Sequence, residues 1–243
     1  MNEFLTGMKK GIAIALGYFA VSFSFGVMAV TGISPLMATI ISATNLTSSG
    51  QYAGVKLIME NASYIEIILT VLLINLRYSL MSISLTQRLD PNMKLPQKLL
   101  IGFGITDEVY AMAITSPHKL TFKYMLGLIS LPFLGWVAGT AVGAYGAQFF
   151  NEDLLKAMGI SLYAMFIAII IPDARRSKPV LYVILISIII STLLYYVPGI
   201  KEIGLGFKII ISTVIAALIG AIVFPIDNKE PEIHEESSGD QDV

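Results

Sequence analysis

Long apolar stretches, separated by short polar segments, recur along the chain. A helix needs roughly 20 residues of this kind to cross a hydrocarbon core about 30 Å thick, and several stretches reach that length. The pattern therefore predicts an all-α polytopic membrane protein. The stretches cover about residues 12–30, 35–60, 64–86, 99–115, 124–149, 154–171, 179–197 and 207–225.

Two of these stretches contain a polar interruption near the middle. The run TNLTSSGQ occupies 44–51, and Thr106-Asp107-Glu108 divides the stretch 99–115. The apolar pieces on either side have six to eight residues, which is about 9–12 Å of helix at 1.5 Å per residue. Because such a piece reaches only partway across the core, we expect about six full transmembrane helices plus two broken, re-entrant elements. Eight ordinary spans are the alternative.

The placement of basic residues favours the re-entrant arrangement. If both broken elements return to the side they entered from, ten of eleven basic residues in the loops join the N-terminus on one side, and Lys201 alone lies opposite. The positive-inside rule makes that side the cytoplasm. We therefore expect the N-terminus and the C-terminus to be inside. Residues 1–226 form the predicted membrane domain, and the acidic segment 227–243 is predicted to be a disordered tail.

The composition excludes several other kinds of chemistry. Of the residues, 55% are hydrophobic and 14% are charged, and the chain has no cysteine and two histidines. Disulfides and thiolate metal sites are therefore excluded, and we expect no zinc site. There is no HExxH motif and no phosphate-binding glycine loop. We expect no enzymatic activity, no catalytic residue, no metal, no cofactor and no nucleic-acid partner.

The two interruptions are the candidate site. Non-helical backbone survives at membrane depth when it is buried in protein or lines a wet cavity. In transporters, broken helices form substrate and ion sites, because their free N–H and C=O groups can coordinate charges. An ordinary loop between two short helices is the alternative for 44–51. The candidate residues of this first interruption are Asn45, Ser49, Gly50 and Gln51.

Charged and polar residues within apolar helices extend the candidate site. Asn75 and Arg77 interrupt the stretch 64–86. An arginine near a helix centre costs roughly 2.5–3.5 kcal/mol on insertion scales, so Arg77 is expected to face a cavity or a counter-ion. Snorkelling of Arg77 to the inner interface is the alternative.

Asp107 and Glu108 diverge by about 100° on a helix, so the two carboxylates should not share one role. We expect one to face the cavity and the other to cap the second half-helix, with Thr106 or Asp107 at the N-cap. We favour Asp107 as the carboxylate nearer the half-helix end. A water-exposed pair at the inner interface is the alternative.

A stripe of small residues runs through 124–149. Gly135, Gly139 and Gly143 recur at a spacing of four. Such a stripe permits close contact between helices, and we interpret it as a packing surface. The alternative is a wall of the permeation path.

Four segments together resemble the AzlC family of bacterial branched-chain amino acid exporters. They are Phe25-Gly26, Ser49-Gly50-Gln51, the run Asn75 to Leu80, and Thr106-Asp107-Glu108-Val109-Tyr110. The resemblance covers most of the membrane part and is densest between residues 11 and 115. The family commonly has Ala-Ser-Gln where this chain has Ser-Gly-Gln, often has Arg-His at Arg77-Tyr78, and has a proline near Tyr18 that this chain lacks.

The resemblance implies the large subunit of a two-component exporter in the bacterial cytoplasmic membrane. Its partner would be a small AzlD-like membrane subunit, and its substrates would be valine, leucine, isoleucine or similar neutral apolar amino acids. From the residues themselves, and not from the resemblance, a protonatable carboxylate in a low dielectric makes a proton the candidate coupling ion. A passive channel or facilitator, and a membrane subunit that does not transport, are the alternatives.

In the predicted binding mode, the two charged groups of the substrate contact different interruptions. Its carboxylate would meet N–H groups of 44–51 and Arg77, its ammonium would meet Asp107 or Glu108, and Phe23, Phe25 or Tyr110 would form an apolar wall. The full predicted binding set is Ser22, Asn45, Ser49, Gly50, Gln51, Asn75, Arg77, Asp107, Glu108 and Tyr110.

Overall fold

A computed structural model describes residues 2–151, 170–172, 174–200 and 202–225, with single positions at 153, 160, 164 and 167. The described part is helical, apart from loops and an isolated bridge between Leu89 and Leu120. Lys201, most of the predicted span 154–171 and the predicted acidic tail 227–243 lie outside the described residues.

Within the described residues, five helices are long and apolar enough to cross a membrane. This confirms the predicted polytopic α-helical class. The sixth predicted span is the one at 154–171. The five helices are α1 (Glu3–Ala29), α4 (Tyr64–Thr86), α7 (Phe122–Gly146, continued by the short 3-10 helix η1, Ala147–Phe149), α9 (Lys178–Tyr196) and α10 (Leu205–Val223).

Both polar interruptions are real breaks between short helices. The first separates α2 (Pro35–Thr44) from α3 (Ser49–Met59), and the second separates α5 (Leu95–Phe103) from α6 (Asp107–Ile114). Hydroxyl side chains begin two of the four helices, because Ser34 caps α2 and Thr106 caps α6. Ser48, before α3, has a φ of 43°, so the backbone turns sharply there.

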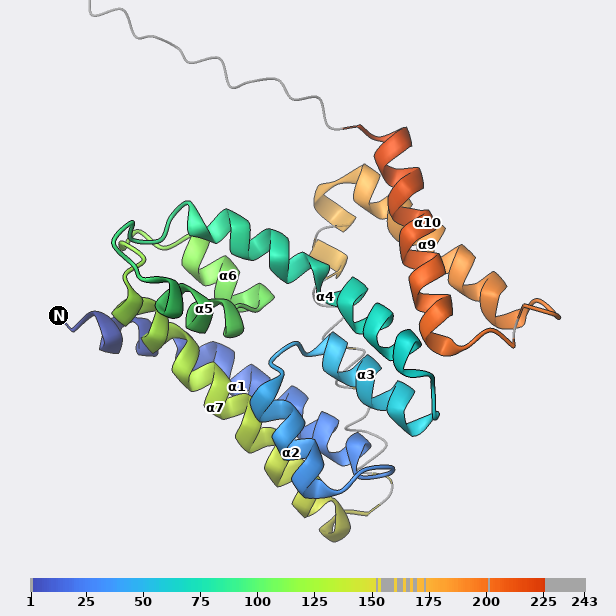
Figure 1. Cartoon of the computed structure of the whole chain (residues 1–243), viewed down its shortest axis with the longest axis horizontal. Helices are drawn as coiled ribbons and strands as arrows, with labels where there is room; N and C mark the ends of the chain where they lie inside the picture. Colours follow the sequence, from blue (N-terminus) through green and yellow to red (C-terminus); the bar gives the residue numbers. More distant parts are fainter. Residues whose placement is uncertain are drawn as a thin grey trace, which may run out of the picture.

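Each pair of short helices is a hairpin that enters and leaves at the same end of the molecule (Figure 1). At one end, Gly32 before α2 lies against Met59 at the end of α3. At the other end, the Leu89–Leu120 bridge joins the loop before α5 to the loop after α6. This arrangement supports the two re-entrant elements over eight ordinary spans.

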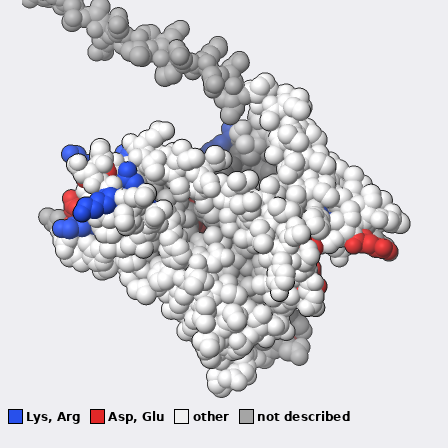
Figure 2. All heavy atoms as spheres, viewed as in Figure 1, with Lys and Arg blue, Asp and Glu red and all other residues white. Residues whose placement is uncertain are grey.

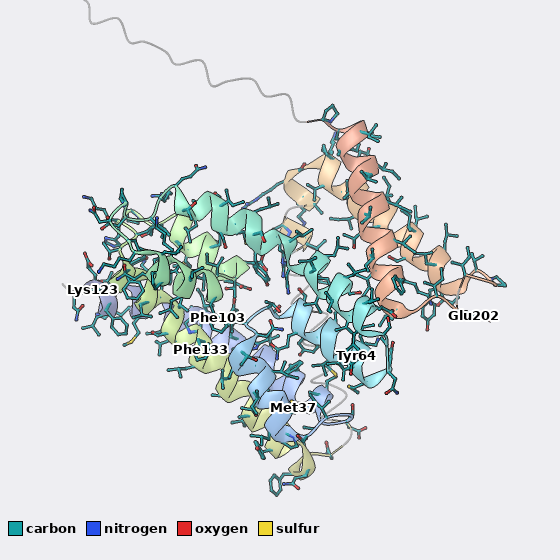
Figure 3. All side chains as sticks on the ribbon, in the orientation of Figure 1. Met37, Tyr64, Phe103, Lys123, Phe133 and Glu202 are labelled. Atoms are coloured by element: carbon teal, nitrogen blue, oxygen red, sulfur yellow. The ribbon has the colours of Figure 1, made fainter. Side chains whose placement is uncertain are left out.

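The basic loops gather at the end from which α5 and α6 enter. The hydroxyl of Thr121 donates to the Glu3 carboxylate at 2.8 Å, which joins the start of α1 to the start of α7. Many Lys and Arg atoms cluster at this end, at the left of Figure 2, and a smaller group lies apart from them in the upper middle of the view. Figure 3 labels Lys123 there, with Tyr64 and Glu202 far from it. The start of α1 and the basic loops 87–98 and 116–123 therefore share one end of the molecule, and the side of the membrane on which this end lies stays a prediction.

Helices α1 and α7 pack along their glycines. A Cβ atom built on Gly143 would lie 2.1 Å from the carbonyl oxygen of Phe23, and one on Gly139 would lie 2.1 Å from Oγ of Ser22. Only glycine permits this approach of one backbone to the other. The glycine stripe is therefore a packing surface, as predicted.

Helix α10 docks on the start of α4 through one buried carboxylate. Oε1 of Glu66, which is 6% exposed, accepts the N–H of Gly206 at 2.8 Å and that of Phe207 at 3.4 Å. A negative charge at a helix N-terminus is favourable because the unpaired N–H groups are there. Glu66 thereby fixes the α9–α10 pair against the rest of the described chain.

Candidate functional site

An ion pair joins the middle of α4 to the second break. Nη1 of Arg77 lies 3.0 Å from Oδ2 of Asp107, and the two side chains are 33% and 23% exposed. Asp107 is the first residue of α6. The pair explains how an arginine is tolerated at this depth, because a carboxylate partner offsets part of its insertion cost. Arg77 thus faces a counter-ion, and the snorkelling alternative is not adopted.

Arg77 also reaches the first break. Its Nη2 donates to Oγ of Ser49 and to the hydroxyl of Tyr78, both at 3.0 Å. That tyrosine hydroxyl lies 3.3 Å from the carbonyl oxygen of Thr47, and its ring lies 4.9 Å from the guanidinium carbon. The arginine is therefore the charge shared by both breaks, and its planar fork suits several directional bonds at once.

The second carboxylate of the pair has a different partner. Glu108 accepts a short hydrogen bond from the hydroxyl of Tyr18, which lies 2.6 Å from Oγ1 of Thr106. Thr106 itself caps α6 by accepting the N–H of Val109. Asp107 and Glu108 diverge as predicted. Of the two predicted N-cap residues, Thr106 is the cap, so the further expectation that one carboxylate caps α6 is wrong.

A cavity of about 580 Å³ lies beside the first break, between α2, α3 and α4. Its walls are mainly aliphatic, and its polar residues are all at or near the break or on α4. The polar lining is Thr44, Asn45, Gln51 and Asn75, and the remaining lining residues are Ile41, Gly50, Gly54, Val55, Ile58, Ile67, Ile68, Val71 and Leu72.

Gly50 makes room for Asn75 in this cavity. A Cβ atom on Gly50 would lie 2.6 Å from Oδ1 of Asn75. This oxygen has no hydrogen-bond partner among the described residues, although it is buried. A buried polar atom without a partner is costly, so Oδ1 is available to a donor that enters the cavity. Oδ1 of the neighbouring Asn45, in contrast, accepts the hydroxyl of Thr47 at 2.6 Å.

Both ends of the Gln51 amide are bonded to other side chains of the protein. It is 1% exposed. Its Nε2 donates to Oγ of Ser42 at 2.5 Å, and its Oε1 accepts the indole N–H of Trp136 at 3.0 Å. The Ser42 hydroxyl lies 2.7 Å from that of Thr140. Although Gln51 borders the cavity, this network attaches the α2–α3 hairpin to α7.

Several predicted residues lie away from the breaks. Ser22 is buried in the α1–α7 interface, where its hydroxyl contacts the backbone oxygens of Phe19 and Gly135. The hydroxyl of Tyr110 pairs with that of Ser84 at 2.9 Å. The predicted apolar wall is also elsewhere, because Phe25 packs on Tyr52 and Phe23 packs on Phe150.

The sequence reasoning missed three aromatic residues that complete the site. Tyr18 holds Glu108, Tyr78 holds Arg77, and Trp136 holds Gln51. Each carries a polar group that needs a partner inside a membrane helix. That requirement was the available signal, and Tyr78 is also the neighbour of Arg77 in the sequence.

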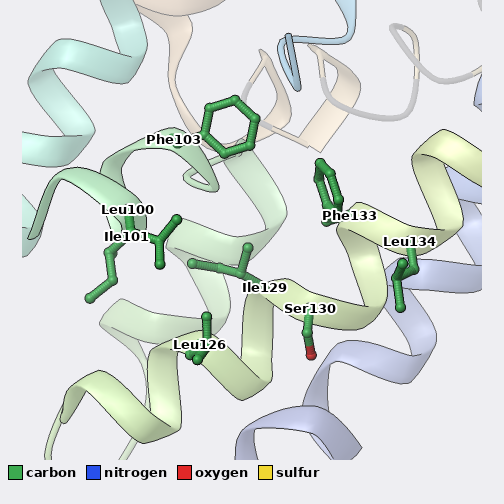
Figure 4. Close-up of a pocket in the computed structure, with 8 residues that line it drawn as sticks. All are labelled: Leu100, Ile101, Phe103, Leu126, Ile129, Ser130, Phe133 and Leu134. Atoms are coloured by element: carbon green, nitrogen blue, oxygen red, sulfur yellow. The ribbon is translucent and has the colours of Figure 1, made fainter. Parts of the chain in front are cut away.

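A second cavity, of about 340 Å³ between α5 and α7, lacks the chemistry of the first (Figure 4). Its lining is apolar except for Ser130, whose hydroxyl donates to the carbonyl oxygen of Gly127. Its side chains offer no charged partner for a polar solute.

Comparisons with known proteins show that the sequence is similar to those of membrane proteins. Residues 13–150 match the family model of the AzlC protein. An uncharacterized membrane protein of Archaeoglobus fulgidus is 29% identical over 175 residues, which cover 71% of this chain and 76% of the relative. The inner membrane protein YgaZ of Escherichia coli K12 is 26% identical over 183 residues, or 72% and 75% of the two chains. An uncharacterized membrane protein of Helicobacter pylori J99 is 24% identical over 188 residues, or 73% and 80%. No solved structure matches the chain.

Proposed function

Because the chain belongs to the AzlC family of membrane proteins, we propose that it is a secondary transporter that exports neutral, apolar amino acids. The observation that carries the proposal is the Arg77–Asp107 ion pair between two helix breaks. A cavity with mainly aliphatic walls lies next to the first break; Gly50 and Asn75 line it, whereas Arg77 and Asp107 are not among its lining residues. Charged groups at membrane depth are expensive and mark substrate or ion paths.

The ion pair favours a zwitterion over a simple ion. A lone anion or cation that bound one partner would leave the other charge unpaired, which is strongly unfavourable at low dielectric. The carboxylate and ammonium of an amino acid can replace both partners together. In this binding mode the carboxylate takes Arg77 and the first N–H groups of α3, and the ammonium takes Asp107.

The cavity accounts for a preference for aliphatic side chains. Its volume of about 580 Å³ lies within the range of small-molecule sites, roughly 300–1,000 Å³. Ile41, Val55 and Val71 are among its apolar lining residues. Burial of a leucine-sized side chain against such residues is worth about 1.5–3 kcal/mol. Against these aliphatic walls a polar side chain would lose its hydration without a replacement.

A small AzlD-like membrane subunit is the proposed partner, and a proton is the proposed coupling ion. Within the described chain, 6% of the residues in an apolar 18-residue stretch of α4 are buried, and the same holds for α9. In the corresponding stretches of α1 and α7, 44% are buried. The exposed faces offer a surface for another membrane helix. We place the protein in the cytoplasmic membrane, with both termini and the basic loops inside.

Efflux measurements test the proposal. Cells loaded with labelled leucine should lose it faster when they express this chain together with its small partner. Arg77→Gln and Asp107→Asn should each lower the efflux rate by roughly tenfold or more, since loss of one ion-pair partner costs more than about 1.4 kcal/mol. Lys56→Gln is the matched control, because Lys56 is an exposed basic residue on α3, away from the breaks.

Two outcomes would contradict the proposal. Normal efflux in both site variants, at equal amounts of protein in the membrane, would show that the ion pair does not bind substrate. In proteoliposomes a carrier gives trans-stimulated counterflow. Leucine flux without trans-stimulation would show a channel instead, and absence of any flux with the partner present would favour a non-transporting subunit.

A further inference from the structure

We infer that Trp136 is a positioning residue that couples the two helix breaks to each other. The inference rests on the proposed function for its biological meaning, but the coupling itself can be measured without substrate. The observation behind it is that one buried side chain is in contact with the supports of both breaks.

On one side, Trp136 fixes the first break. Its indole N–H donates to Oε1 of Gln51 at 3.0 Å, and the ring clusters with Leu46, which lies in the break itself. The other end of the Gln51 amide donates to Ser42. Because an amide has distinct donor and acceptor ends, rotation of Gln51 would break both bonds. The orientation of the indole therefore sets the position of Gln51 and of the residues before it.

On the other side, Trp136 touches the residue that holds the second break. Its ring packs edge-on against that of Tyr18, with centroids 5.4 Å apart and an interplanar angle of 76°. The Tyr18 hydroxyl donates to Glu108. Edge-to-face contacts have a preferred geometry, so a movement of the Tyr18 ring changes the environment of the indole.

These contacts form one continuous path: Glu108, Tyr18, Trp136, Gln51. Trp136 is 1% exposed and Tyr18 is 6% exposed, so there is little free space in which one ring could move without the other. When Glu108 exchanges the Tyr18 hydroxyl for another partner, the tyrosine loses this acceptor and the indole loses a fixed neighbour. The first break then relaxes. A spatial path alone does not demonstrate coupling, so the test measures coupling directly.

Trp136 is the single tryptophan of the chain, so it reports on its own environment. In the purified, substrate-free protein, Glu108→Ala should shift the emission maximum of Trp136, and Tyr18→Phe should shift it similarly. The matched control is Asp107→Ala, which removes the adjacent carboxylate but acts on Arg77 and not on Tyr18. Equal emission in Glu108→Ala and wild type would overturn the inference, and so would an equal shift in the Asp107 control.

A thiol at the first break gives the second readout. The chain has no cysteine, so Thr44→Cys, at the exposed end of α2, places a unique reactive group there. Adding Glu108→Ala should change its maleimide labelling rate by about twofold to thirtyfold, the range of coupling measured between linked residues. In a Trp136→Phe background, which keeps an aromatic ring but removes the N–H donor, this change should be lost. An undiminished change in that background would overturn the inference.

The outcomes separate this inference from the proposed function. Leucine added to the wild-type protein should change the emission of Trp136. Coupling in the variants without any response to leucine would leave the coupling intact and contradict the proposed substrate. Efflux of leucine together with a Trp136 emission that is unchanged in Glu108→Ala would support the proposed substrate and overturn the coupling. If Trp136→Phe fails to insert or fold, the emission measurements on the other variants decide alone.

Discussion

Substitution of Gly143 by alanine tests whether the α1–α7 interface is as close as the structure has it. The added Cβ would lie 2.1 Å from the carbonyl oxygen of Phe23 and 2.8 Å from its carbonyl carbon, whereas ordinary contacts begin at 3.4 Å. The two backbones must therefore separate by more than 1 Å, because the Cβ–oxygen distance has to increase from 2.1 Å to at least 3.4 Å. Such overpacking typically costs about 1–3 kcal/mol.

The matched control is Gly17→Ala in α1. No atom lies within 4 Å of a Cβ at this position, so alanine adds no clash. Alanine is also the better helix former, by about 1 kcal/mol. Reversible unfolding in mixed micelles, followed by the emission of Trp136, would give the free energy of unfolding. We expect that value to fall by about 1–3 kcal/mol for Gly143→Ala and to stay equal or rise for Gly17→Ala.

Wild-type stability of Gly143→Ala would refute this reasoning. If the same variant then slowed efflux, the glycine stripe would line the permeation path instead, which is the interpretation that the packing distances now disfavour.

The remaining predictions concern the site and its supports. Gly50→Ala should lower thermal stability by displacing the Asn75 amide, which lies 2.6 Å from the new Cβ, and Asn75→Ala in the same chain should restore it. Glu66→Ala leaves the N-terminus of α10 without its acceptor and should cost about 1–3 kcal/mol in unfolding, whereas Glu66→Gln should cost less. Glu108→Gln keeps an acceptor for Tyr18 but removes the ionisable group, so efflux from vesicles should no longer respond to an imposed pH gradient. Asn92→Cys should react with impermeant reagents only from the cytoplasmic side, and labelling from outside would contradict the re-entrant topology.

The breaks could be predicted from the sequence because membrane thickness makes length informative. The run 44–51 brackets the non-helical residues 45–48, and the interruption at 106–108 lies within two residues of the break at 104–106. A half-helix of six to eight apolar residues is too short to cross the membrane. A broken, re-entrant element is therefore one of the few structures that such a stretch can form. The glycine stripe was predictable for a similar reason, since its spacing of four puts its members on one face.

The partners of the charged residues could not be predicted. Tyr18 and Glu108 are 90 residues apart, and Gln51 and Trp136 are 85 apart, so no local periodicity relates them. Ser22 illustrates the opposite error. A serine in a helix can satisfy its hydroxyl on a nearby backbone carbonyl, and Ser22 does so, which makes its polarity uninformative about substrate.

The number of charged side chains at the breaks suggests that substrate binding and ion coupling belong to different carboxylates. Among the described residues there, two carboxylates, Asp107 and Glu108, accompany the single guanidinium of Arg77, which pairs with Asp107, whereas Glu108 is held by an uncharged hydroxyl. A zwitterion carries no net charge, so its arrival exchanges partners without changing this imbalance. Only a cation that is not part of the substrate can change it. Glu108 is held by the Tyr18 hydroxyl and not by Arg77, so binding of the zwitterion to Arg77 and Asp107 leaves Glu108 with its own partner. In the proposed function Asp107 is the group for substrate binding and Glu108 the candidate for coupling, which gives the adjacent carboxylates separate roles although neither is the helix cap.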